Sequence, residues 1–131
     1  MVQTPWADDY GLPPDPLAAA ILVSGIFDIA PLHYSYLQPM IQLDDGIIRR
    51  NSPLFSVRPS RTPVWVNWGA EETSEFARQA ANFHQAWLGQ GNPGELSALP
   101  AADHYRGIHG FEDASSSLCQ WLAGRLNTRS A

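Results

Sequence analysis

The sequence predicts an α/β fold with three mostly parallel strands and flanking helices, on three observations. Two apolar runs, 17–27 and 62–69, lack the polar–apolar alternation of a half-exposed strand, which is typical of strands covered on both faces of a parallel sheet. After the second run, apolar residues recur at the spacing of one helical face. The order strand, irregular excursion, strand, helix, strand, helix then describes successive α/β units.

The length of 131 residues fits one domain, 1–131, with a modest hydrophobic core. The opening segment is rich in proline and turn-forming residues, and three prolines in 13–16 disfavour a helix or a central strand. We therefore expect 1–16 to form a linker or loop. After the first strand, 17–27, the chain is expected to be irregular and partly exposed, with at most one short helix around 44–50.

The second strand, 62–69, is rich in β-branched and aromatic residues and ends at a glycine. A helix follows, because apolar residues recur at spacings of 4, 3 and 4 along one helical face: Phe76, Ala80, Phe83 and Trp87. A third strand at 95–99 precedes a polar loop, 100–110, and a last helix at 113–127 presents leucines four residues apart.

Composition excludes several classes of protein. With 8 basic and 13 acidic residues the net charge is −5, which disfavours a nucleic-acid partner. A single cysteine, Cys119, cannot form an internal disulfide. No segment approaches the roughly 18 apolar residues that a membrane span needs, and the start lacks the layout of a signal peptide. We expect a cytoplasmic protein with no membrane partner.

Candidate functional side chains follow the second and third strands. The loop after the second holds Glu71, Glu72 and Glu75, and the loop after the third holds His104 and His109. Loops after adjacent parallel strands open on the same edge of a sheet, so a carboxylate and an imidazole can meet there. Such a pair suits general-base catalysis, because the acid orients the imidazole and stabilises its charged form. The spacing alone equally fits a solvated loop histidine.

Four segments together resemble the C-terminal half of α/β-hydrolases of the kynurenine formamidase (arylformamidase) and carboxylesterase type. They occur in the order of that family and cover about 17–126: LVSGIFDIAPL, RRNSPLF, TPVWVNWGAEETSEFARQAANFHQAW and DHYRGIH. The resemblance implies a partial α/β-hydrolase fold, with these strands forming the C-terminal part of the sheet.

The resemblance also implies a site and a reaction. The family's acid lies four positions before the phenylalanine of the E-T-S-E-F segment and is usually Asp, which maps onto Glu72, with Glu71 as a competitor. The family's histidine in its D-H-F/Y segment maps onto His104. The implied reaction is hydrolysis of a small carboxylic ester or aryl formamide, in which His104 is the base and Glu72 the orienting acid, without a metal or cofactor.

The family's serine nucleophile is not found in this sequence. Neither the G-x-S-x-G elbow nor the H-G-G segment of the oxyanion hole occurs, so Met1 resembles the start of a truncated reading frame and the chain alone is expected to be inactive. Ser24, Ser52 and Ser74 lack the glycine-flanked turn of a nucleophile, and Cys119 is interpreted as a packing residue. The alternative is a non-catalytic fragment or pseudoenzyme, which self-associates or pairs with a missing N-terminal half through an open sheet edge.

Other side chains favour structural roles. The spacing of His33, His84 and His109 does not fit a metal site. Trp65 and Trp68 are expected in the core, although they could line a pocket for an aromatic substrate. Two further expectations concern the segment after the first strand: a turn or cap role for Asp28, and by analogy alone a place in a lid for His33, Tyr34 and Tyr36.

Overall fold

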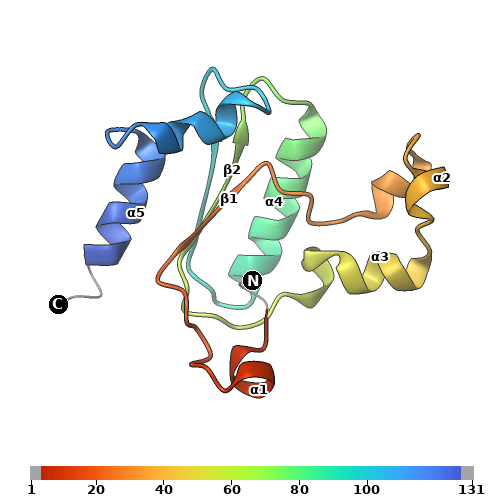
Figure 1. Ribbon diagram of the computed structural model, residues 1–131, viewed down its shortest axis with the longest axis horizontal. Helices are drawn as coiled ribbons and strands as arrows, with labels where there is room; N and C mark the ends of the chain where they lie inside the picture. The colour runs from red at the N-terminus through yellow and green to blue at the C-terminus, as the bar shows by residue number, and fades with distance from the viewer. Residues whose placement is uncertain (1–3, 128–131) are drawn as a thin grey trace.

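The computed structural model describes residues 4–127, and within them it confirms an α/β architecture with one open sheet (Figure 1). The strands are β1 (Ala20–Val23), β2 (Val64–Gly69) and β3 (Gly94–Leu99), ordered β1-β2-β3 with both pairs parallel. The α-helices are α1 (Trp6–Tyr10), α2 (Gln38–Ile41), α3 (Asp45–Asn51), α4 (Ser74–Gly89) and α5 (Ser117–Asn127), and the 3-10 helices are η1 (Ala30–Tyr34), η2 (Pro53–Ser56) and η3 (Arg106–Glu112).

The two long helices cover opposite faces of the sheet (Figure 1). Alternate residues of β2 point to opposite sides, so Val64 and Val66 pack in the core cluster that contains residues of α4, whereas Trp65 packs with residues of α5. Because β2 lies between two strands and two helices, nearly all of its residues are buried. This explains why its sequence shows no alternation of polar and apolar residues.

Helix α4 packs on the sheet with the apolar stripe that the sequence predicts. Ala80, Phe83 and Trp87 are 0–1% exposed, and the ring of Phe83 stacks on that of Phe27 at a centroid distance of 4.2 Å. Trp87 also donates its indole N–H to the carbonyl of Pro93, at 2.9 Å, in the turn that leads into β3. The helix therefore fixes both the segment after β1 and the start of β3.

Two elements, β1 and α5, are shorter than expected. β1 ends at Val23 rather than near 27, because Ser24 has a φ of 48°, outside the extended region. Helix α5 begins at Ser117 rather than 113, because the Asp113 carboxylate accepts hydrogen bonds from the backbone and hydroxyl of Ser115 and holds a turn there.

The segment between β1 and β2 holds more helix than expected. The predicted short helix is confirmed as α3, with Asp44 accepting from the Ile47 amide as its N-cap. The additional helices η1, α2 and η2 each have a proline at their first or second position. Proline is pre-organised for the first turn of a helix, so these prolines start short helices rather than prevent them.

The segment expected as a linker or loop, 1–16, also contains a helical turn. Of its described part, Trp6–Tyr10 forms α1, which ends at Gly11 with a φ of 64°; residues 1–3 lie outside the described residues. The prolines of 13–16 follow in irregular structure. None of the helices within 4–127 is both long and apolar enough to cross a membrane.

Candidate functional site

A tight turn after β2 holds the carboxylate of Glu72 at the end of the sheet. The Glu72 amide donates to the carbonyl of Gly69 at 3.0 Å, and the Gly69 amide donates to Oε2 of Glu72 at 2.7 Å. A Cβ on Gly69 would lie 2.3 Å from the carbonyl oxygen of Ala102, so only glycine allows the loop after β3 to pack this closely. That loop therefore lies directly against the Glu72 turn.

The close approach brings His104 onto Glu72. Nδ1 of His104 lies 2.5 Å from Oε1 of Glu72, within hydrogen-bonding distance. The carboxylate is enclosed, with 1% of the Glu72 side chain exposed, whereas 56% of the His104 side chain is exposed. The two candidates from adjacent strand ends thus touch, and their catalytic role stays a prediction.

Glu71, the competing acid, takes another position. Its backbone amide donates to the carbonyl of Ala102 at 3.0 Å and the residue is exposed. The carboxylate that reaches the His104 ring is that of Glu72.

Two aromatic rings flank the imidazole of His104. The ring of Phe76, in the first turn of α4, lies at a centroid distance of 5.1 Å, and that of Tyr105 lies at 5.9 Å in an edge-on arrangement. Within 4–127 no hydrogen bond is formed by Nε2 of His104. The ring is therefore held through Nδ1 and by its two aromatic neighbours, whereas Nε2 makes no hydrogen bond to the described residues.

A third strand end also contributes to the site. The hydroxyl of Ser24, directly after β1, donates to Oε2 of Glu72 at 2.6 Å. Burial acts to raise the pKa of Glu72, but the hydrogen bonds from Ser24, His104 and Gly69 outweigh it, so the pKa lies below its ordinary value of 4.5. The carboxylate is held in its charged form, as an acid that orients an imidazole must be.

The remaining histidines lie elsewhere. His109 pairs with Glu112 at 3.0 Å and His33 Nδ1 contacts the carbonyl of Leu43 at 3.2 Å, while Nε2 of His84 is buried and has no hydrogen-bond partner among the described residues. Among residues 4–127 no group of three or more potential ligands could hold a metal ion.

Several structural expectations are confirmed. Trp65 is buried at 8% exposure and Trp68 packs against the other core cluster. Asp28 caps a turn, because its Oδ1 accepts from the Ala30 amide at 2.9 Å. The serines dismissed as nucleophiles have other surroundings: Ser52 is fully buried and accepts from the Ile29 amide, and Ser74 begins α4. Cys119 lies half-buried in α5.

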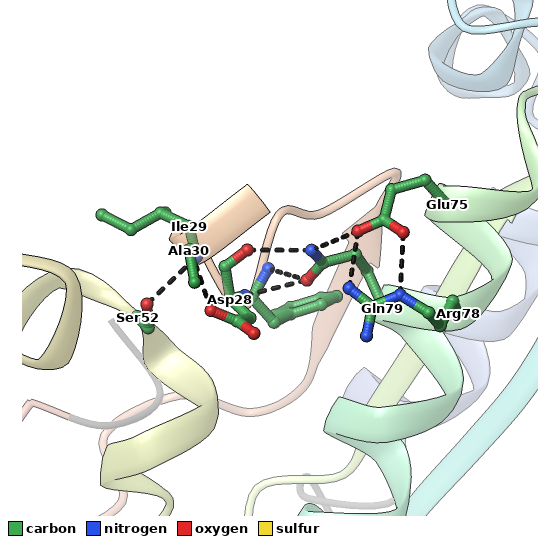
Figure 2. Close-up of polar contacts among 8 residues, drawn as sticks. Asp28, Ile29, Ala30, Ser52, Glu75, Arg78 and Gln79 are labelled. Carbon is green, nitrogen blue, oxygen red and sulfur yellow. Dashed lines mark hydrogen bonds and ion pairs between the residues drawn. The ribbon is translucent and has the colours of Figure 1, made fainter. Parts of the chain in front are cut away.

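Sequence reasoning missed Gln79, a buried polar residue that fixes the turn after β1 (Figure 2). Its Oε1 accepts from the amides of Phe27 and Asp28 at 3.0 and 2.8 Å, and its Nε2 donates to the carbonyl of Asp28 and to Glu75. The signal was present, because Gln79 lies three residues after Phe76 and so falls on the buried stripe. Ser24 offered no comparable signal, since its partner is 48 positions away.

Comparisons with known proteins agree with this architecture. No protein-family model matches the chain. The chain is 26% identical over 128 residues to a kynurenine formamidase from Salmo salar and 24% identical over 127 residues to one from Danio rerio; each match covers 93% of this chain and 43% of the relative. Among solved structures it is similar to a propionate-bound esterase from Thermogutta terrifontis, with a TM-score of 0.50 and 18% identity, covering 94% of this chain and 44% of the esterase.

The chain thus spans less than half the length of the relatives it matches. The structural likeness to the esterase supports the fold, three parallel strands with flanking helices. The sequence likeness relates the chain to kynurenine formamidases. The chain therefore has an α/β-hydrolase-like fold, and it is similar to part of enzymes of the formamidase and esterase type.

Proposed function

We propose that this chain carries the base and the orienting acid of a serine hydrolase that cleaves small carboxylic esters or aryl formamides. The observation that carries the proposal is the 2.5 Å contact between Nδ1 of His104 and Oε1 of the enclosed Glu72. The similarity to kynurenine formamidases supports the choice of substrate class.

In the proposed mechanism His104 exchanges protons through Nε2. Glu72 accepts Nδ1–H, which keeps Nε2 as the basic nitrogen of the neutral ring. Nε2 takes the proton of a serine hydroxyl as that hydroxyl attacks the carbonyl carbon, and the imidazolium that forms is stabilised by the Glu72 carboxylate. His104 then returns the proton to the leaving alcohol or amine.

Two parts of this mechanism come from outside the 131 residues. The sequence has no G-x-S-x-G segment, and Ser24 directs its hydroxyl to Glu72 rather than to His104. The nucleophile and the oxyanion donors are therefore supplied by another segment or chain. We expect the purified chain alone not to hydrolyse p-nitrophenyl acetate above the rate in buffer.

A specific observation favours a second candidate, an interaction subunit without catalysis. Among the described strands β1 pairs only with β2, so its other edge presents unpaired backbone groups. Such an edge is a template for a further strand. An interaction subunit would use this edge whether or not the Glu72–His104 pair takes part in chemistry.

A chimera tests the first candidate. This chain replaces the matching segment of the Salmo salar kynurenine formamidase, and hydrolysis of an aryl formamide and of p-nitrophenyl acetate is measured. We expect the chimera to turn over at least one substrate, and His104→Ala and Glu72→Gln to lower kcat by about 10²–10⁴-fold, the usual contribution of general-base catalysis.

The matched control is His109→Ala, because His109 is also an exposed loop histidine paired with a glutamate. We expect its kcat to stay within about twofold of the parent chimera, since surface pairs contribute little. Equal activity of His104→Ala and the parent would contradict the proposed function.

A further inference from the structure

Ser24 ends β1 in a backbone conformation that residues other than glycine rarely adopt. Its φ is 48°, in the left-handed region, although its amide still donates to the Asn67 carbonyl of β2 at 2.8 Å. Strain of this kind persists only where the surroundings impose it, and it concentrates at functional sites. The hydrogen bond that this conformation allows Ser24 to make therefore indicates why the strain is retained.

That contact is with Oε2 of Glu72. Ser24 Oγ donates to it at 2.6 Å, and the Gly69 amide donates to the same oxygen at 2.7 Å. Rotation of the carboxylate about its last bond would break both hydrogen bonds. With Oε2 held by two donors, Oε1 is directed toward Nδ1 of His104.

We infer that Ser24 is a positioning residue for the Glu72–His104 pair: its hydroxyl fixes the plane of the carboxylate and thereby the tautomer and orientation of the imidazole. The catalytic meaning of this role rests on the proposed function. A glutamate has one side-chain torsion more than the aspartate usual in the resembled enzymes, so its carboxylate has more freedom for a neighbouring donor to remove.

The residues around Ser24 leave room for the turn that brings its hydroxyl to Glu72. Gly107 of η3 packs over the turn, since a Cβ there would lie 3.3 Å from Val23 and 3.9 Å from Ser24 Oγ. The ends of all three strands thus meet at one carboxylate, with Ser24 from β1, Glu72 from β2 and His104 from β3. The hydroxyl extends the pair into a three-strand network.

The test compares two variants that separate the hydroxyl from the backbone strain. Ser24→Ala removes the hydroxyl and keeps the strain, whereas Ser24→Gly removes both. The readouts on the chain itself are the thermal midpoint and the tautomer of the neutral His104 ring, measured by ¹⁵N NMR of histidine-labelled protein. We expect Ser24→Gly to melt at a higher temperature than Ser24→Ala, because both lack the hydroxyl and only Ser24→Gly relieves the strain, and we expect both variants to lose the preference for the Nδ1–H tautomer.

Gln42→Gly is the matched control for strain, because Gln42 also has a φ of 48° but ends α2 rather than a strand of the site. We expect it to leave the His104 tautomer unchanged. If Ser24→Gly keeps the wild-type tautomer, the inference is overturned, whatever Ser24→Ala does.

Glu72→Ala separates this inference from the proposed function. Loss of the Nδ1–H preference in Glu72→Ala but not in Ser24→Gly would reject the role of Ser24 and leave the pair intact. If wild-type His104 shows no such preference, or if Glu72→Ala does not change it, the pair is absent in solution and both proposals fail.

Discussion

Enclosure of the carboxylate distinguishes the Glu72–His104 pair from an ordinary surface ion pair. Glu112 and His109 form a similar contact at 3.0 Å, but the Glu112 side chain is 75% exposed and that of Glu72 only 1%. An exposed pair is screened by water and contributes little, whereas an enclosed carboxylate with several donors is held in one charge state and one orientation. A glutamate–histidine pair can therefore orient an imidazole firmly in the enclosed case of Glu72 and His104, but not in the exposed case of Glu112 and His109.

The lowered pKa of Glu72 predicts how acid affects stability. A carboxyl group whose pKa is lower in the folded state stabilises the fold above its unfolded value, near 4.5, and this stabilisation is lost as the pH falls through the folded pKa. Glu72→Gln lacks this ionisation. We expect wild type to exceed Glu72→Gln in unfolding free energy at pH 7, and the difference to narrow below about pH 4.5.

Urea unfolding of both proteins between neutral and acidic pH measures this difference. Glu75, Asp103 and Asp113, whose pKa values are also lowered, are present in both proteins and so cancel. A difference that stays constant across the pH range would show that the Glu72 carboxylate is not held by its donors.

At the scale of elements, α4 positions the site through a polar contact as well as through its apolar stripe. Phe76 at its start packs on the His104 ring, Phe83 fills the core, and Gln79 between them bonds the turn after β1 (Figure 2). The amides of Phe27 and Asp28 satisfy their hydrogen bonds at Gln79 rather than in a strand. The helix therefore links the end of β1 to the loop that carries His104.

Substitution of Gln79 tests this link. Gln79→Ala leaves two backbone amides without their acceptor, and we expect a loss of about 2–4 kcal/mol in unfolding free energy, since each unsatisfied buried group costs about 1–3 kcal/mol. Gln120→Ala, which removes an exposed hydrogen bond to the Ala114 carbonyl, is expected to change it by less than about 0.5 kcal/mol. Similar urea midpoints for the two variants would refute the role of Gln79.

The sequence predicts the elements whose signals are local. The stripe of α4, the glycine that ends β2 and the alignment of Glu72 and His104 on neighbouring strand ends follow from spacing and from the geometry of parallel sheets. The length of β1 and the roles of Ser24 and Gln79 depend on partners 48 to 52 positions away, which no local pattern reveals. The helices η1, α2 and η2 were missed because proline marks both helix starts and loops.

At the scale of the whole molecule, the sheet formed by residues 4–127 is open at β1, which pairs there only with β2. Its residues are only half-buried, whereas those of β2 are almost all buried. An apolar strand with one free edge favours association with another strand. The chain matches 43% of the length of the kynurenine formamidases.

The open edge predicts self-association of the isolated chain. We expect size-exclusion chromatography with light scattering to show a mass above that of one chain, rising with protein concentration, because unpaired edges pair with one another. A monomer at every concentration, with a single cooperative thermal transition, would count against the edge as an interaction surface.

The most direct test of the central claim, that Glu72 and His104 act as one unit, is a double-mutant cycle on kcat in the chimera. Because Glu72 acts only through His104, we expect the double variant Glu72→Gln, His104→Ala to have the same kcat as His104→Ala alone, as residues that function together are strongly non-additive. If the two losses multiply instead, Glu72 and His104 act independently, and the contact between them is not the basis of the activity.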